Sequence, residues 1–197
     1  MSEHRHFIFH KPFGYLSQFI NNMTKRKNKK LLGELIEVPE GTMAIGRLDE
    51  NSEGLLLLTT DGQVSADIGS GKYEKEYFAQ VDGIITNEAI QRLRDGVEIG
   101  IRSNKYQTLP CKVQRLDPEP LFEVRKKLRE ERHGPTSWVS VTLREGKFRQ
   151  VRKMTSAAGF PTLRLVRVRI GNIKLESLSP GEMIEVDSLK YRERLFR

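Results

Sequence analysis

The longest apolar run in the chain is residues 55–58, four leucines in succession between Gly54 and a polar turn at residues 59–62. Such a run is typical of a strand buried on both faces, because neither face needs polar side chains. Asp61 follows at once and is suited to cap a helix that reaches Ile68. The pattern therefore predicts a buried strand followed by a short helix.

Shorter periodic segments extend this mixed pattern along the rest of the chain. Further strands are expected at residues 6–9, 43–45, 77–81 and 138–143, with two more between 110 and 135. Further helices are expected at residues 31–36, 86–94 and 147–158. Thr86 would cap the second of these, and Gly96 lies just beyond its end. The chain is expected to be an α+β protein.

Two segments near the C-terminal end have amphipathic patterns. In the expected helix 147–158, Phe148, Val151 and Met154 recur at helical spacing and predict one apolar face. In the strand expected at residues 166–170, valine and isoleucine alternate with Arg167 and Arg169. This second pattern predicts one apolar face and one basic face.

Composition limits the class of protein. The 197 residues and 22.7 kDa suit one domain or two small subdomains that share a core. Mean hydropathy is −0.52, and no apolar run approaches the roughly 20 residues of a membrane span. Residues 1–6 lack the apolar stretch of a secretory signal, and Cys111 is the single cysteine, which excludes an internal disulfide framework. We expect a cytoplasmic protein that does not contact membranes.

Positive charge is concentrated in two places. The net charge is +8, and residues 125–169 hold 13 Lys or Arg against three acids. A second basic cluster occupies residues 25–30. Basic clusters attract and hold phosphate backbones, so a nucleic-acid partner is favoured over a generally solvated surface. The charge pattern does not separate RNA from DNA, or an enzyme from a passive binder.

The candidate chemistry begins at a lone carboxylate. Asp49 follows Arg47 in a loop just ahead of the buried leucine strand, where a carboxylate can be held still and partly desolvated. A surface salt bridge between these two residues and a catalytic site are about equally compatible with the pattern. His4, His6 and His10 recur at strand spacing, but they lack nearby cysteine or acidic ligands. We interpret them as ordinary surface side chains rather than a metal site.

Five collinear segments that span residues 11–171 resemble the pseudouridine synthases, in the branch that modifies ribosomal RNA. The central one is G-R-L-D-E-N-S-E-G-L-L-L-L-T-T-D-G, residues 46–62. The others are K-P-F-G at 11–14, K-E-Y-F-A-Q-V-D-G at 75–83, E-G-K-F-R-Q-V-R-K-M at 145–154 and G-F-P-T-L-R-L-V-R-V-R-I-G at 159–171. The resemblance implies an α+β fold of two subdomains flanking an RNA-binding cleft, within one catalytic domain over residues 1–197.

The resemblance also implies roles for individual residues. Asp49 matches the family's nucleophile, which attacks either C1′ of the ribose or C6 of the base. Arg152 matches the arginine that keeps this carboxylate ionised, and Arg47 the arginine that holds the RNA with its uridine flipped out. Tyr77 matches the tyrosine that stacks on the uracil, although a tyrosine in a strand is also a common core residue. Leu165 matches the apolar pocket residue, with Leu163 as an alternative.

The implied substrate is ribosomal RNA, in particular 23S RNA of the large subunit. No cofactor or metal is expected, and the sequence has no G-x-x-x-x-G-K-[ST], G-x-G-x-x-G or H-E-x-x-H motif. We expect a monomer without the N-terminal RNA-binding module that many relatives carry. Two alternatives are a non-catalytic RNA-binding protein and a synthase acting on another structured RNA. A nucleosidase is a third, although such enzymes usually use two carboxylates.

Overall fold

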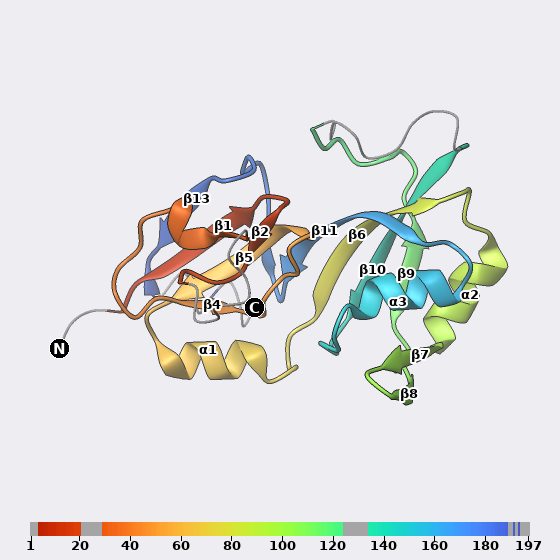
Figure 1. Cartoon of the computed structure of the whole chain (residues 1–197), viewed down its shortest axis with the longest axis horizontal. Helices are drawn as coiled ribbons and strands as arrows, with labels where there is room; N and C mark the ends of the chain where they lie inside the picture. Colours follow the sequence, from red (N-terminus) through yellow and green to blue (C-terminus); the bar gives the residue numbers. More distant parts are fainter. Residues whose placement is uncertain (1–3, 21–28, 124–133, 189–190, 192, 194–197) are drawn as a thin grey trace. The chain divides into compact units, whose positions relative to one another are not determined.

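A computed structural model describes residues 4–20, 29–123, 134–188, 191 and 193 (Figure 1). The chain divides into two compact units. The first, unit 1, comprises residues 1–75 and 166–197, and the second, unit 2, comprises residues 76–165. Mainly antiparallel sheet and three α-helices confirm the expected α+β class.

Unit 1 is built on a sheet with the strand order β13-β1-β5-β11. Strand β5 (Glu53–Thr59) pairs antiparallel with β1 (His6–Lys11) and parallel with β11 (Thr162–Ile170). The smaller elements are β2 (Tyr15–Leu16), β3 (Lys30–Leu31), the 3-10 helix η1 (Leu32–Glu34), β4 (Met43–Ile45), β12 (Ile173–Lys174) and β13 (Met183–Val186). Helix α1 (Gly62–Gly69) follows β5, and the Asp61 carboxylate caps it by accepting from two backbone N–H groups. The predicted strand and helix are confirmed here.

Every residue of β5 is buried, as the leucine run predicts. On one face, Leu56 and Leu58 form a core with Phe7 and Phe9 of β1 and with Leu32 of η1. The neighbouring antiparallel strands and this core hold β5 rigidly on both edges. The loop that leads into β5 is therefore attached to a fully buried strand that is paired on both edges.

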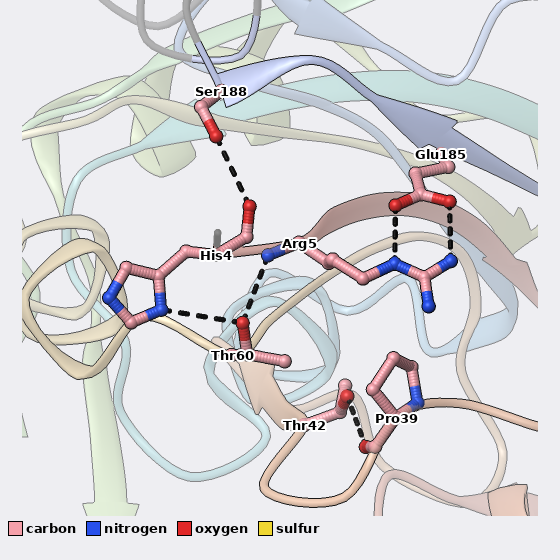
Figure 2. Close-up of polar contacts among 7 residues, drawn as sticks. All are labelled: His4, Arg5, Pro39, Thr42, Thr60, Glu185 and Ser188. Atoms are coloured by element: carbon pink, nitrogen blue, oxygen red, sulfur yellow. Dashed lines mark hydrogen bonds and ion pairs between the residues drawn. The ribbon is translucent and has the colours of Figure 1, made fainter. Parts of the chain in front are cut away.

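Polar contacts fasten the first residues of unit 1 to two other strands (Figure 2). The Arg5 guanidinium donates two hydrogen bonds of 2.6 Å to the carboxylate of Glu185 in β13. The Arg5 backbone N–H donates to Thr60 Oγ1 just after β5. These contacts link the segment just before β1 to β13 and to the residue after β5.

Unit 2 contains a sheet with the strand order β6-β10-β9, built from β6 (Lys75–Asp82), β10 (Thr136–Leu143) and β9 (Lys112–Arg115). A separate hairpin joins β7 (Glu98–Ile101) to β8 (Asn104–Gln107). Helices α2 (Asn87–Asp95) and α3 (Gln150–Ala157) complete the unit, with the Thr86 hydroxyl capping α2 as predicted. The hairpin is not among the elements that the pattern predicts.

One core joins the two helices to the sheet of unit 2. The buried side chains of this core are Ala79, Val81, Ile85, Ala89, Ile90, Leu93, Val97, Ile99, Val113, Val139, Val141, Leu143, Val151, Met154, Ala158 and Leu165. Residues 139, 141 and 143 of β10 alternate along the strand, so both helices pack on one face of the sheet. Val151 and Met154 of α3 face this core as the helical spacing predicts.

Two expectations for the C-terminal half are wrong, and a third, two strands between 110 and 135, is tested only in part. Helix α3 begins at Gln150, so Phe148 precedes it and is 67% exposed instead of joining the apolar face. In β11, Arg167 is 1% exposed, whereas Val168 is only half-buried, so the expected basic face does not exist at this point. Between 110 and 135, β9 is the single strand among the described residues, and residues 124–133 lie outside them.

The histidines are also not surface residues as a group. His6 is 1% exposed, stacks on the Tyr191 ring with centroids 4.6 Å apart, and its Nδ1 lies 2.9 Å from Thr59 Oγ1. His10 is 5% exposed, with Nδ1 2.6 Å from the Leu178 carbonyl oxygen. Of the described histidines, only His4 is exposed. Both buried rings form part of the folded core of unit 1.

Candidate active site

The candidate nucleophile lies in the loop between β4 and β5 of unit 1. Asp49 is half-buried, Arg47 is exposed, and Leu48 between them is buried. The Asp49 carbonyl oxygen accepts a hydrogen bond of 3.0 Å from the Ser52 N–H. The loop thus turns sharply at Asp49 and leads directly into the buried strand β5.

Ser17 fixes the backbone beside Asp49. Its hydroxyl donates to the Leu48 carbonyl oxygen at 2.9 Å and lies 3.0 Å from the Leu48 N–H, which donates to it. Both groups are buried, so water does not compete for these bonds. Because Leu48 is held through both of its backbone polar groups, the position of Asp49 is set by a buried contact.

Lys11 holds the other side of the same loop. Its side chain is fully buried, and Nζ donates at 2.8 Å to the carbonyl oxygens of Pro12 and Ser52 and at 3.5 Å to that of Glu50. Burial lowers the pKa of Lys11 to about 8, although the nearby carboxylates of Glu53, Asp49 and Glu50 act in the opposite direction. Lys11 therefore supplies a desolvated positive charge beside Asp49 and orients the backbone around it.

A second buried cation lies beneath the start of β5. The Arg167 Nε donates to the Leu55 carbonyl oxygen at 2.8 Å, while Nη2 is buried without a hydrogen-bond partner among the described residues. A Cβ on Gly54 would lie 2.3 Å from the Arg167 carbonyl oxygen, so only glycine, here at φ +100°, permits this approach of β11 to β5. Burial, and secondarily Arg167, lowers the pKa of Lys75. Arg167 thus lies close enough to both Lys11 and Lys75 for charge repulsion to lower the pKa of each.

The other predicted site residues belong to unit 2. Tyr77 in β6 is half-buried and packs against the core described above, while Leu165 in β11 is 5% exposed and is part of that core. Arg152 in α3 is half-buried, and its Nη1 donates to the Thr162 carbonyl oxygen at 3.3 Å. Leu163 is more exposed than Leu165. Arg47 and Asp49 share one loop of unit 1, and the remaining three residues share unit 2.

Sequence reasoning missed the residues that hold the loop. Lys11 and Arg167 both fall within the segments that resemble the family, but the resemblance gives neither residue a role in supporting Asp49. An available signal for Arg167 was Gly54, because a glycine at the start of a buried strand indicates a close backbone neighbour. Nothing in the local pattern distinguishes Ser17, whose contact with Leu48 crosses 31 residues of the chain.

The basic segments contain fewer available cations than their composition suggests. Arg164 is buried, with Nη1 donating to the Glu123 carbonyl oxygen, and Arg169 pairs with Glu74 at 3.3 Å. Lys29 pairs with Glu50 at 2.8 Å. Like Arg167, these residues have hydrogen-bond or ion-pair partners within the protein. Residues 25–28 and 125–133, which hold a further part of both clusters, lie outside the described residues.

The described residues contain neither a cluster suited to a metal ion nor a helix suited to a membrane. No group of three or more His, Cys, Asp or Glu in that part of the chain has a geometry suited to a metal ion. No described helix is long and apolar enough to cross a membrane. The cluster at the Asp49 loop is instead one of carboxylates, lysines and arginine, which suits acid–base or nucleophilic work by a carboxylate.

Known proteins with similar sequences share one kind of name, ribosomal large subunit pseudouridine synthase. Over 181 residues the chain is 41% identical to ribosomal large subunit pseudouridine synthase E of Vibrio parahaemolyticus, covering 91% of this chain and 72% of that protein. It is 41% identical over 176 residues to the protein of the same name from Xanthomonas axonopodis, covering 88% and 89%. Ribosomal large subunit pseudouridine synthase B of Bacillus subtilis is 33% identical over 184 residues, covering 92% and 67%.

The fold and the family profile agree with these relatives. A crystal structure of a pseudouridylate synthase superposes with a TM-score of 0.77 at 27% identity, covering 98% of this chain and 75% of that one. The human RNA pseudouridylate synthase domain containing 1 shares the fold at a TM-score of 0.54 and 15% identity, with 95% and 81% covered. The family described as RNA pseudouridylate synthase matches residues 5–157. The chain therefore belongs to the RNA pseudouridine synthase family.

Proposed function

We propose that this chain converts a specific uridine of large-subunit (23S) ribosomal RNA to pseudouridine, with Asp49 as the nucleophile. In this proposal Arg47 holds the RNA with the uridine flipped out, Tyr77 stacks on the uracil, and Arg152 keeps the Asp49 carboxylate ionised. Leu165 lines the apolar side of the pocket. No cofactor takes part, and the single catalytic domain acts as a monomer.

The rigid support of the Asp49 loop carries this proposal. A nucleophile that must meet one atom of a flipped nucleotide has to be held in place before the substrate arrives. The Ser17 hydroxyl and the Lys11 ammonium provide that support from opposite sides of the loop. The relatives' printed names favour ribosomal RNA of the large subunit as the substrate.

The reaction is an isomerisation, so atoms balance without a co-reactant. The N1–C1′ bond breaks, a C5–C1′ bond forms, the proton on C5 is lost, and N1 gains a proton. Asp49 can assist by attacking C1′ or by adding to C6, and both routes need an ionised carboxylate in a partly desolvated site. Lys11 places a positive charge close to the Asp49 carboxylate from within unit 1.

The substitution Asp49→Asn tests the proposal. Wild type should form pseudouridine in 23S RNA transcripts or in assembling particles, whereas Asp49→Asn should lose about a thousandfold or more in rate, since the nucleophile is gone. RNA affinity and thermal unfolding should be unchanged. The matched control is Glu50→Gln, a neighbouring carboxylate whose charge pairs with Lys29, and it should retain most of the activity. Turnover by Asp49→Asn above background would exclude this mechanism.

Two further measurements separate the alternatives. Pseudouridine mapping across all RNAs of a strain lacking this protein should show one missing site in 23S RNA. A missing site in another structured RNA would correct the substrate, and no missing site would favour a non-catalytic binder. Release of free uracil from RNA would indicate a nucleosidase.

A further inference from the structure

An exposed aromatic ring lies among cations at residues 144–153 of unit 2. Phe148 is 67% exposed, although its spacing from Val151 and Met154 would place it on the apolar face of a helix. Residues 144–153 include five Lys or Arg against the single acid Glu145. An exposed phenylalanine within strongly positive surroundings is unusual for a side chain that serves only folding.

The turn that carries Phe148 is firmly built. The Glu145 carboxylate accepts hydrogen bonds from the Tyr106 hydroxyl, from the Leu109 N–H at 3.0 Å and from Gln150 Nε2 at 2.7 Å. The Lys147 N–H donates to Gln150 Oε1 at 3.0 Å. The one acid of the segment is thus fully engaged in shaping the turn. Phe148 is consequently presented outward by a fixed backbone and not by a loose loop.

The backbone next to Phe148 also departs from ordinary geometry. Arg149, which precedes α3, has φ 52° and ψ 37°, a left-handed conformation that side chains other than glycine rarely adopt. This conformation ends the extended turn at Phe148 and starts the helix one residue later. Unfavourable backbone conformations of this kind recur where a side chain is needed in a particular direction.

Cations are arranged around two rings of this surface. Lys153 Nζ lies 5.2 Å from the centre of the Phe148 ring and donates to the Gly100 carbonyl oxygen at 2.6 Å. Lys147 Nζ lies 4.7 Å from the centre of the Tyr106 ring. Arg144, at the start of the turn, is exposed. Aromatic rings interleaved with cations are the arrangement by which proteins stack bases and hold phosphates together.

We propose that Phe148 is a stacking platform for an unpaired base of the substrate RNA outside the target uridine, flanked by phosphate contacts from Arg144 and Lys147. This proposal rests on the proposed function for the identity of the RNA. An RNA occupant is favoured over a protein because the surface is positive and its single acid already has three partners. The ring would supply affinity for the RNA and would take no part in bond breaking.

Substitutions of Phe148 test the stacking contact. Phe148→Ala should weaken binding of a 23S RNA fragment roughly fivefold to a hundredfold, the range for losing one base–aromatic stack, while Phe148→Tyr should bind like wild type. Single-turnover rates at saturating RNA should be unchanged. The matched control is Ile84→Ala, since Ile84 is a 44% exposed apolar residue of the same unit with no Lys or Arg among its sequence neighbours.

Salt titration separates the ring from its cations. Phe148→Ala should weaken binding equally at all salt concentrations, whereas Lys147→Gln should reduce the slope of log K against log salt by about 0.7 to 0.9, the value for one phosphate contact. Unchanged RNA affinity in Phe148→Ala would overturn the proposal. Wild-type self-association that Phe148→Ala abolishes without affecting RNA binding would assign the surface to a second copy of the chain. Failure of wild type to form pseudouridine would reject the proposed function. The stacking proposal is tested separately, because the binding measurements do not require turnover.

Discussion

The cations of the Asp49 loop and those of the turn at residues 144–153 belong to the same basic protein but occupy opposite environments. In unit 1, Lys11, Lys75 and Arg167 are buried, and their hydrogen bonds end on backbone carbonyl oxygens. In unit 2, Arg144 and Lys147 are exposed, and Lys147 lies beside the Tyr106 ring. Cations of equal charge are therefore buried against backbone carbonyl oxygens in unit 1 and open to solvent in unit 2.

The difference follows from desolvation. A buried ammonium or guanidinium has lost its hydration and recovers stabilisation only through fixed partners, so it holds those partners in place. An exposed cation keeps its hydration and can exchange it for a phosphate, with a strong dependence on salt. We expect substitutions in the first set to affect stability and catalysis, and substitutions in the second set to affect RNA affinity.

The largest effect is expected at Arg167. Arg167→Ala leaves the Leu55 carbonyl oxygen without its donor and opens a cavity, which should lower the free energy of unfolding by about 2–4 kcal/mol. Arg167→Met should cost less, because it fills the space while removing the unpartnered Nη2 and the repulsion with Lys75. Urea unfolding measures both. Arg144→Gln, as a control from the exposed set, should stay within about 0.5 kcal/mol of wild type. An Arg167→Ala variant as stable as wild type would show that this buried cation does not stabilise unit 1, contrary to the comparison.

The next effect concerns pH and Lys11. The folded-state pKa of about 8 lies below the usual 10.5, so folded protein binds fewer protons than unfolded protein between these values. The contribution of Lys11 to the free energy of unfolding therefore rises as pH increases from about 8 to 10.5. The positive charge beside Asp49 disappears over the same window. Single-turnover rates should decline above pH 8, approaching tenfold per pH unit, while stability from this group increases.

The control for this prediction is Lys11→Met, which is neutral at every pH. It should react more slowly than wild type near pH 7, and the ratio between the two rates should shrink as pH rises above 8. Any alkaline decline that both proteins share belongs to the RNA or to other groups. A ratio that stays constant from pH 7 to 10 would show that the charge of Lys11 does not support the reaction.

The same contrast explains which features the sequence could predict. The buried strand β5, the Asp61 cap of α1 and the Thr86 cap of α2 each depend on a few consecutive residues, and all three are confirmed. Whether a cation is buried depends instead on which strand lies next to it. Alternation predicted an exposed Arg167, but its side chain is buried, with Nε donating to the Leu55 carbonyl oxygen and Nη1 near Gly46.

Phe148 shows the complementary error. Its spacing fits a helical apolar face, but the helix begins only after the left-handed turn at Arg149. That turn depends on Glu145 reaching Tyr106 and Leu109, a contact between segments more than 35 residues apart. The motifs that contain Asp49, Arg47, Tyr77, Arg152 and Leu165 can be read from the sequence, and the roles of these residues in the reaction stay predictions. The supports of that motif were not readable, because they are long-range contacts.

A moderate effect is expected at Ser17. Ser17→Ala removes both hydrogen bonds to the buried backbone of Leu48 and should cost about 1–2 kcal/mol of stability. Because Asp49 follows directly, the single-turnover rate should fall roughly tenfold while RNA affinity is unchanged. Ser140→Ala is a matched control, since it removes a serine hydroxyl buried in unit 2 that bonds Glu76 instead. A normal rate in Ser17→Ala would show that the loop keeps its geometry without this contact.

The smallest effect is expected at Lys29. This residue is exposed, like Arg144 and Lys147, but its ammonium already has a partner within the protein. It belongs to the basic cluster at residues 25–30, yet its Nζ lies 2.8 Å from a Glu50 carboxylate oxygen next to the candidate nucleophile. Both side chains are partly exposed, so a double-mutant cycle of Lys29→Ser with Glu50→Gln should give a coupling of only about 0.2–1 kcal/mol, reduced by salt.

The salt dependence of RNA binding then shows whether Lys29 stays paired with Glu50 or contacts a phosphate in the complex. If Glu50 retains the ammonium in the complex, Lys29→Ser should leave the slope of log K against log salt unchanged, whereas Lys147→Gln lowers it. A slope that falls by about 0.7 to 0.9 in Lys29→Ser would mean that the ammonium leaves Glu50 for a phosphate when RNA binds. In that case Glu50→Gln should strengthen RNA binding, because it frees the same ammonium in advance.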